Sequence, residues 1–245
     1  MLNKFGINFD RLSPLQRLSI INKNGLGALE YEPNKSLETV NTNYNLDRIA
    51  EEAEKILNDE VEGVDLDTVY NLGGSSGGAR PKAHIICFDS EWIVKFPCAI
   101  DHEAIGEREF VANKLAKDCG INVNEFRLFD SKICSGFFGS KRFDRIGGKK
   151  LHMISLSALL ETTHRLPNLD YGHLLQVICK ISADRESDLH EAFRRMCFNV
   201  FYKNRDDHGK NFAFLYDENL KGYKLSPAYD ITSLPNKPEH EMTVT

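Results

Sequence analysis

The sequence lacks the features that mark a secreted, zinc-binding or membrane-spanning chain. Its six cysteines are scattered and include no C-x-x-C pair, so neither a disulfide framework nor a zinc site is indicated. No apolar run approaches the ~18–20 residues that a membrane span needs, and the N-terminus has no signal-peptide core. These absences predict a cytoplasmic protein with reduced thiols and no membrane partner.

An excess of basic charge is also missing. The 245 residues include 31 Lys and Arg against 36 Asp and Glu, which gives a net charge of −5. A general nucleic-acid binder needs a basic surface for its phosphate contacts, so that function is not indicated. The composition, with 41% hydrophobic and 27% charged residues, is ordinary for a globular protein of one large domain or two small lobes.

A glycine-rich stretch at residues 73–78 lacks the two common phosphate-loop patterns. It is not a Walker A loop, because Lys82 directly follows Pro81 and no Gly-Lys-Ser/Thr is present, and it is not the G-x-G-x-x-G of ordinary protein kinases. By composition alone it is typical of a flexible linker. It nevertheless directly precedes a predicted strand pair, where a phosphate-covering loop belongs. Its backbone amides can bind phosphate oxygens, and Ser75 and Ser76 can themselves be phosphorylated.

The hydrophobic patterns predict a first part rich in strands and a second part rich in helices. The expected β-structure comprises two hairpins and a mixed region of strands and turns: 84–88 with 92–96 around a turn at 89–91, 121–145, and 211–216 with 223–226. The expected helices, from their apolar spacing, are 46–57, 101–117, 155–162, 171–182 and 188–203.

Two of these helices have predicted core positions that the spacing of their apolar residues selects. In helix 101–117 they are Ala104, Phe110, Val111 and Leu115. In helix 188–203 they are Leu189, Phe193, Met196, Cys197, Val200 and Phe201.

Residues 204–211 have the spacing of a kinase catalytic loop. Asp206 stands five positions before Asn211, and D-x-x-x-x-N is the spacing found in protein-kinase catalytic loops. In that chemistry one carboxylate orients the hydroxyl that is phosphorylated, while an amide and a second carboxylate hold magnesium on the phosphates. The hairpin can bring Asp230 to the same end as Asn211. Asp206 is therefore the predicted base, and Asn211 and Asp230 are the predicted magnesium ligands.

The neighbours of Asp206 leave alternatives open. Asp207 is the weaker candidate for the base, because the spacing to the asparagine favours Asp206. His208 either orients a neighbouring group or packs beneath the loop, which we favour, and Lys210 either neutralises phosphate charge or is a surface lysine. A metal-dependent phosphohydrolase with Asp206, Asp207 and His208 as ligands would need further ligands at metal spacing, and the sequence offers no convincing ones.

Lys95 lies between apolar neighbours on the second predicted strand. It is either a snorkelling edge residue or the lysine that contacts nucleotide phosphates. The second role needs an acidic partner on the following helix, where Glu103, Glu107 and Glu109 all lie. Glu109 is preferred for its central position, and the alternative is that all three acids form the solvated face of that helix.

Taken together, these residues resemble the HipA-like serine/threonine kinases, the toxin components of bacterial toxin–antitoxin modules. The resemblance rests on four segments, with support from residues 15–29: 74–82, 142–145 (Arg-Phe-Asp-Arg), 204–211 and 225–231. It implies a two-lobed, protein-kinase-like α+β fold, in which residues 1–150 form a small β-rich lobe and residues 151–245 form a mainly helical lobe.

The resemblance also implies an ATP- and Mg²⁺-dependent protein kinase that autophosphorylates its glycine-rich loop. Ser75 stands at the position of the family's autophosphorylated serine, with Ser76 as the second candidate; in that family, this modification ejects the loop and inactivates the kinase. Each remaining site residue has an implied role: Asp206 in catalysis; Asn211 and Asp230 in binding Mg²⁺; and Lys95, Gly77, Gly78, Ala79, Lys82, Glu109, His208 and Lys210 in binding ATP.

The family further implies partners: a protein substrate, such as an aminoacyl-tRNA synthetase, and a helix-turn-helix antitoxin through which DNA is contacted only indirectly. Two departures from the family stand out. The chain begins too close to its kinase-like core to hold an additional N-terminal subdomain, and it stops fifteen residues after Asp230. We therefore expect a short, split or truncated member, a variant resembling HipT, or a pseudokinase. The alternative function is a catalytically inactive binding module that works with an antitoxin or a missing partner chain.

Overall fold

The computed structural model describes residues 12–21, 25, 27–33, 45–57, 80–98, 104–162, 169–234 and 237–242. The chain divides into two units by its internal contacts. Unit 1 comprises Met1–Glu107 and Phe126–Arg142, and unit 2 comprises Arg108–Glu125 and Phe143–Thr245. The predicted phosphate-loop residues Ser75, Ser76, Gly77, Gly78 and Ala79 lie outside the described residues, as does Glu103, so their assignments stay predictions.

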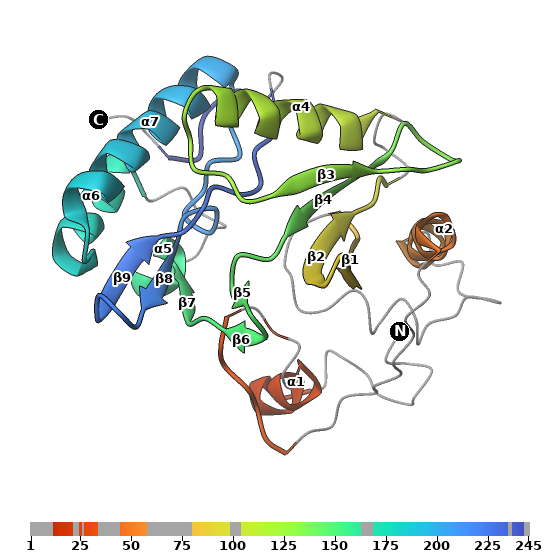
Figure 1. The fold of residues 1–245 in the computed structure, drawn as a ribbon, viewed down its shortest axis with the longest axis horizontal. Helices are drawn as coiled ribbons and strands as arrows, with labels where there is room; N and C mark the ends of the chain where they lie inside the picture. The colour runs from red at the N-terminus through yellow and green to blue at the C-terminus, as the bar shows by residue number, and fades with distance from the viewer. Residues whose placement is uncertain are drawn as a thin grey trace. The chain divides into compact units, whose positions relative to one another are not determined.

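Unit 1 is built on a four-stranded antiparallel sheet with the strand order β1-β2-β4-β3 (Figure 1). Its elements are helices α1 (Pro14–Ile21) and α2 (Leu46–Leu57) and strands β1 (Lys82–Cys87), β2 (Ser90–Lys95), β3 (Phe126–Phe129) and β4 (Phe137–Lys141). Alternate residues of β1 and β2 are buried, because successive side chains of a strand point to opposite faces. The core of this unit includes Ala83, Ile85, Trp92 and Val94 from the sheet and Ile49 from α2.

The hairpin of β1 and β2 is confirmed, but its turn lies earlier than predicted. Cys87 pairs with Ser90, so that Phe88 and Asp89 alone form the turn rather than residues 89–91. Their φ angles are 52° and 54°. Positive φ at both central residues is the type I′ pattern, whose twist matches that of the flanking strands. The two strands therefore begin two residues earlier than the sequence indicated.

Helix α4 (Ile105–Asp118) belongs to both units, with most of its residues in unit 2. The prediction of Val111 and Leu115 as core residues was wrong, because they are 52% and 41% exposed. Ala112 and Ala116 are buried instead and pack in a cluster with Phe198. Residues 108–125 therefore belong to unit 2 by their internal contacts, and the lobe boundary near residue 150 stays a prediction.

Unit 2 combines a three-stranded antiparallel sheet, in the order β7-β8-β9, with two longer helices that pack against each other (Figure 1). Its remaining elements are β5 (Arg145–Ile146), β6 (Lys149–Lys150), β7 (Met153–Ser155), α5 (Leu156–Leu159), α6 (Tyr171–Ile181), α7 (Arg185–Tyr202), β8 (Ala213–Asp217) and β9 (Gly222–Leu225). The second predicted hairpin and the helices at 171–182 and 188–203 are confirmed to within a few residues. The helix expected at 155–162 is reduced to the four residues of α5.

The buried face of α7 is largely polar, which the sequence pattern did not predict. Four residues at helical spacing are buried along it: Asp188, Ala192, Arg195 and Asn199. Phe193 and Phe201 were predicted to lie in the core but are 57% and 86% exposed, and Val200 is also exposed. Only Leu189 and Met196 of the predicted set pack against the core of unit 2. None of the described helices has both the length and the apolar character that crossing a membrane requires.

Candidate active site

The predicted catalytic loop begins directly after α7. Lys203 ends this helix in the left-handed conformation, with φ 57°, and so turns the chain out of the helical path. Within the loop, the side-chain Nδ2 of Asn211 donates a hydrogen bond of 2.7 Å to the backbone oxygen of Asp206. The backbone N of Asn211 donates to the oxygen of His208 at 2.8 Å. These two bonds close the D-x-x-x-x-N segment and bring Asp206 and Asn211 together.

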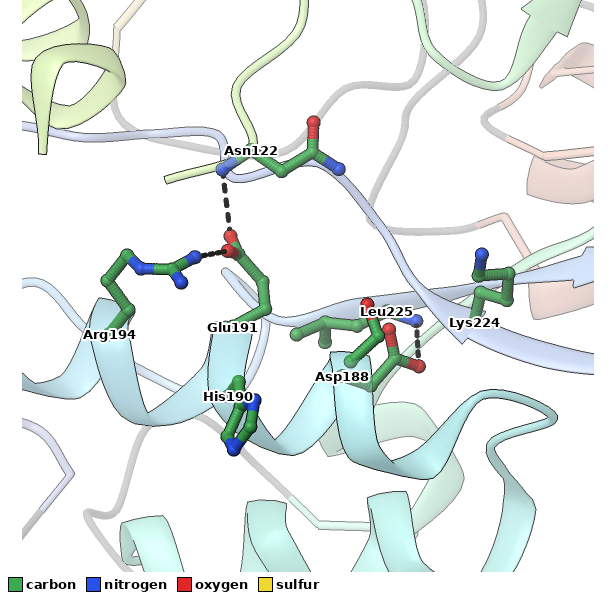
Figure 2. A pocket seen from close by; sticks show the side chains of 8 residues that line it. Asn122, Asp188, His190, Glu191, Arg194, Lys224 and Leu225 are labelled. Carbon is green, nitrogen blue, oxygen red and sulfur yellow. Dashed lines mark hydrogen bonds and ion pairs between the residues drawn. The ribbon is translucent and has the colours of Figure 1, made fainter. Parts of the chain in front are cut away.

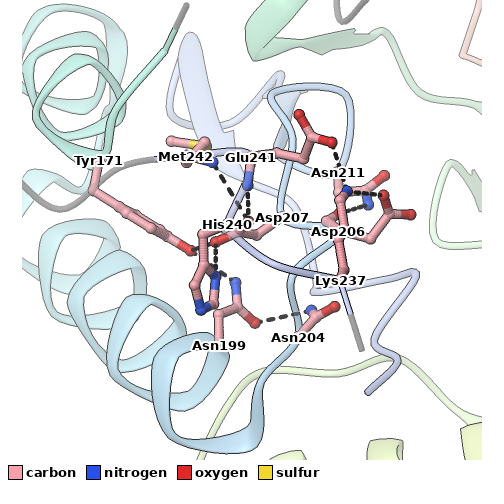
Figure 3. A network of polar contacts seen from close by, with 10 residues as sticks. All are labelled: Tyr171, Asn199, Asn204, Asp206, Asp207, Asn211, Lys237, His240, Glu241 and Met242. Atoms are coloured by element: carbon pink, nitrogen blue, oxygen red, sulfur yellow. Dashed lines mark hydrogen bonds and ion pairs between the residues drawn. The ribbon is translucent and has the colours of Figure 1, made fainter. Parts of the chain in front are cut away.

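The carboxylate of Asp206 is 40% exposed and forms an ion pair with Lys237, whose Nζ lies 3.3 Å from Oδ1 (Figure 3). Lys237 also pairs with Glu241. Burial by itself lowers the pKa of Lys237, but the hydrogen bond to Glu241 and the charge of Asp206 outweigh this effect and raise the pKa above its ordinary value. Lys237 is therefore a cation at neutral pH. Sequence reasoning missed it because it lies 31 residues from Asp206 and in no motif.

Asp207 has the opposite environment, because its side chain is fully buried. Its carboxylate accepts hydrogen bonds from the Tyr171 hydroxyl at 2.7 Å, from His240 Nδ1 at 2.9 Å, and from the backbone N of Glu241 and of Met242 at 2.9 Å and 3.4 Å (Figure 3). Burial and the adjacent charge of Asp207 raise the pKa of Tyr171, so its hydroxyl stays protonated and donates. Asp207 is thus engaged in holding the fold.

The remaining loop residues occupy different environments. His208 is half-buried, and Lys210 is exposed. The metal-hydrolase alternative needs Asp207 as a ligand, but protein donors already bind both oxygens of that carboxylate. Across the part of the chain that the structure describes, no group of three or more His, Cys, Asp or Glu residues could hold a metal ion. This alternative therefore has no support in the described site.

Asp230 lies in the segment that follows β9, and its backbone is in the left-handed region with φ 54°, which aspartate adopts more readily than most residues. The hydroxyl of the preceding Tyr229 donates to the backbone oxygen of Lys210, the residue before Asn211. Burial, and secondarily the charge of Asp230, raises the pKa of Tyr229, which keeps this donor protonated. The Asp230 segment is therefore attached to the loop that carries Asn211.

The polar face of α7 fixes the backbone of these segments. Asp188 Oδ2 accepts from the backbone N of Leu225 at 2.8 Å, as Figure 2 shows, and Arg195 Nη2 donates to the oxygen of Ser226 at 2.7 Å. Asn199 Oδ1 accepts from the side-chain amide of Asn204, at the start of the loop, at 3.0 Å. The helix that precedes the predicted catalytic loop thus also holds the start of the segment that ends at Asp230.

Two cavities lie beside this framework. The larger, of about 270 Å³, is lined by residues that include Asp188, Glu191 and Arg194 (Figure 2). Glu191 accepts there from the backbone N of Asn122 at 3.0 Å and from Arg194 at 2.9 Å, so its charge is already compensated. The smaller, of about 20 Å³, lies against the predicted catalytic loop, with Asn204, Asp207, Asn211 and Tyr229 among its lining residues.

The two lysines predicted to contact phosphate in unit 1 are neighbours. The register of β1 and β2 places Lys82 directly opposite Lys95. Like charges at opposite positions of two strands repel each other, so this placement carries an electrostatic cost unless other groups compensate the two charges. Lys95 Nζ also lies 5.7 Å from the centroid of the Phe138 ring.

Burial distinguishes the candidate acidic partners of Lys95. Glu109 is only 7% exposed, whereas Glu107 is exposed. The alternative that all the acids form one solvated face of the helix is therefore wrong for Glu109. Because Lys95 belongs to unit 1 and Glu109 to unit 2, the pairing of these two residues stays a prediction.

The Arg-Phe-Asp-Arg element has a structural role. Arg142 is 4% exposed and donates to the backbone oxygen of Gly25 at 3.2 Å, which ties the N-terminal part of unit 1 to its sheet. Asp144 is buried as well and forms an ion pair of 2.9 Å with Arg145.

Comparisons with known proteins bear on this fold. The family model for the HipA-like C-terminal domain matches residues 74–245. A Haemophilus influenzae protein named "Putative kinase" is 26% identical over 189 residues, which cover 68% of this chain and 54% of the relative. The Sinorhizobium fredii protein "Putative kinase Y4mE" is 34% identical over 193 residues, which cover 67% of this chain and 43% of the relative.

A solved structure extends the comparison to nearly the whole chain. HipA from Shewanella oneidensis, determined in a complex with HipB and its operator DNA, matches with a TM-score of 0.72 at 19% identity. The match covers 99% of this chain and 63% of that chain, whereas this chain spans about half the length of the curated relatives. The expected α+β fold of the HipA-like kinases is confirmed, and the chain belongs to the HipA-like C-terminal domain family.

Proposed function

We propose that this protein is an ATP- and Mg²⁺-dependent serine/threonine protein kinase of the HipA type. The observation that carries the proposal is the bond from the Asn211 side chain to the backbone of Asp206, in a loop to which Tyr229 attaches the Asp230 segment. A predicted base and two predicted metal ligands thereby belong to one connected framework. The kinase names of the curated relatives support the same reaction class.

The residues of this framework suit a magnesium–nucleotide complex. Because the Asn211 amide nitrogen binds the Asp206 carbonyl, its amide oxygen points away from that carbonyl. With the Asp230 carboxylate it offers the hard oxygen donors that Mg²⁺ prefers. Bound Mg²⁺ would neutralise charge on the ATP phosphates. The remaining ATP contacts are proposed as the resemblance implies them: Lys82, Lys95, Glu109, His208, Lys210 and the glycine-rich loop.

Asp206 would act on the substrate hydroxyl. Its carboxylate orients a serine or threonine Oγ toward the γ-phosphorus and accepts the hydroxyl proton. The new bond joins Oγ to phosphorus, and the bond to the leaving oxygen of ADP breaks. Fixing the Asp206 backbone through Asn211 keeps the base at a constant distance from the metal ligands, which is the positioning on which this reaction depends.

Regulation and partners follow from the family. We propose autophosphorylation at Ser75 or Ser76, where about two added negative charges would disfavour binding of ATP phosphates nearby. We also propose a helix-turn-helix antitoxin as partner, with DNA contacted through it, and a protein substrate such as an aminoacyl-tRNA synthetase. The Shewanella HipA structure, which contains HipB and operator DNA, supports the antitoxin part of this proposal.

Phosphate transfer tests the proposal directly. Incubation with labelled ATP and Mg²⁺ should place phosphate on Ser75 or Ser76, as located by mass spectrometry, and Asp206→Ala should abolish the label. Asp118→Ala, at an exposed carboxylate at the end of α4, is the control and should retain it. An active Asp206→Ala protein would refute the assignment of the base. If calorimetry detects no binding of ATP with Mg²⁺, the result favours the alternative function of a catalytically inactive binding module.

A further inference from the structure

The predicted catalytic loop and Lys203, which precedes it, bind a later segment of the chain, residues 234 and 237–242. Figure 3 shows Lys237, His240, Glu241 and Met242 of this segment. The backbone N of Leu234 donates to the oxygen of Lys203 at 3.0 Å, and Arg205 donates to the oxygen of Lys237. Beyond Lys237, three donors of residues 240–242 converge on the buried carboxylate of Asp207. The segment is therefore held on both sides of Lys237.

This attachment determines where the Lys237 side chain lies. Its backbone oxygen is fixed by the residue that precedes Asp206, and its Nζ contacts Asp206 Oδ1 at 3.3 Å. Glu241, whose own backbone N is bound by Asp207, also contacts the same ammonium group. Two carboxylates thus share one cation, and the backbone attachments keep that cation beside the proposed base.

We propose that Lys237 is a positioning residue for phosphoryl transfer, and that it acts by fixing the orientation of the Asp206 carboxylate. This inference rests on the proposed kinase function. With Oδ1 held by Lys237, the carboxylate cannot rotate freely, and Oδ2 is the oxygen that receives the substrate hydroxyl. A misplaced reacting group lowers the reaction rate even when substrate binding is unchanged. Loss of Lys237 should therefore lower kcat and leave KM unchanged.

If this ion pair had only a structural role, the expected effect of removing Lys237 would be different. Ion pairs between exposed side chains contribute little to stability. The protein contains a matched example away from the catalytic loop: Lys224 and Asp184 lie 3.6 Å apart, with side chains 38% and 45% exposed. The corresponding values for Lys237 and Asp206 are 29% and 40%. If both pairs were only surface contacts, removing either lysine should have the same small effect.

Steady-state kinetics of three variants test the inference. Lys237→Met should lower kcat by about 10- to 100-fold, with the KM for ATP and the thermal unfolding temperature unchanged. Lys237→Arg should restore most of kcat, because a guanidinium group can also bind a carboxylate. Lys224→Met should match the wild-type protein in all three quantities.

Each other outcome overturns the inference. A wild-type kcat in Lys237→Met removes the positioning role, and so does a loss of kcat that comes with a lower unfolding temperature. If Lys237→Arg restores no activity, a positive charge at this position is not sufficient to orient the Asp206 carboxylate. A wild-type protein that neither binds ATP with Mg²⁺ nor transfers phosphate refutes the kinase function itself, and the inference with it; the wild-type measurement alone distinguishes that case.

Discussion

Asp206 and Asp207 are neighbours in the chain with opposite surroundings. The Asp206 side chain is 40% exposed and contacts one lysine, whereas Asp207 is fully buried among donors from α6 and from residues 240–242. A group that meets a substrate must be accessible, whereas a buried carboxylate is stable only when donors bind it. The D-x-x-x-x-N spacing had favoured Asp206, and burial now supplies a physical reason for the same choice.

Removing the Asp207 carboxylate should strongly destabilise the protein. Asp207→Ala leaves the Tyr171 hydroxyl and the backbone N of Glu241 and Met242 without their acceptor inside the fold. We expect the free energy of unfolding to fall by about 3–5 kcal/mol, as for other broken buried charged contacts. Chemical denaturation followed by circular dichroism measures this quantity.

Two milder variants calibrate that measurement. Tyr171→Phe removes a single donor from the same carboxylate and should cost about 1–3 kcal/mol. Asp118→Ala, at an exposed site, should stay within about 0.5 kcal/mol of the wild-type value. A stability of Asp207→Ala equal to that of Asp118→Ala would contradict a holding role for Asp207.

Helix α7 shows what a hydrophobic pattern can and cannot predict. Its existence and approximate bounds followed from the sequence, but three of the residues assigned to the core, Phe193, Val200 and Phe201, are exposed. The buried face is polar because Asp188, Arg195 and Asn199 bind the backbone or side chains of neighbouring segments. Apolar spacing carries no signal for such contacts, so Phe193 and Phe201 were placed in the core although both are exposed.

Two phenylalanines of α7 should therefore respond very differently to truncation. Phe198 is 8% exposed and packs with Ala112, Ala116, Ile121 and Ile231, so Phe198→Ala should cost about 3–5 kcal/mol of unfolding free energy. Phe201 is 86% exposed, and Phe201→Ala should change stability by less than about 0.5 kcal/mol. Parallel denaturation of the two variants makes the comparison, and equal losses would mean that the assignment of the buried face is wrong.

Most of the fold was accessible from sequence because the informative segments are local. The two hairpins, α2, α6 and the loop spacing each lie within a short stretch whose pattern indicates its structure. Lys237 and His240 are different, since they reach Asp206 and Asp207 from 31 and 33 residues away. Their contacts depend on the path of the folded chain, which no local pattern encodes.

Stability should fall in alkaline solution because two tyrosine hydroxyls resist ionisation in the folded state. Burial raises the pKa of Tyr171 and Tyr229 above the ordinary value of 10, and the neighbouring aspartate charges add to this effect. The folded state thus favours the protonated hydroxyls, so their contribution is complete below about pH 10 and is lost as the pH rises further.

Denaturation at a series of pH values measures this dependence. The free energy of unfolding should be nearly constant between about pH 7 and 9 and should decline above about pH 10. Tyr171→Phe and Tyr229→Phe should each reduce the decline, because a phenylalanine has no proton to lose. An unchanged slope in the double variant would exclude the tyrosines as its cause.

The shared use of the Asp207 carboxylate also constrains how this part of the molecule can change in evolution. A substitution at Tyr171 or His240 removes one donor and leaves the other bonds to the carboxylate in place. A substitution at Asp207 leaves all of these donors without their acceptor at once. Replacing one donor therefore costs less stability while the carboxylate remains, whereas losing the carboxylate first removes all the contacts that join Asp207 to residues 240–242.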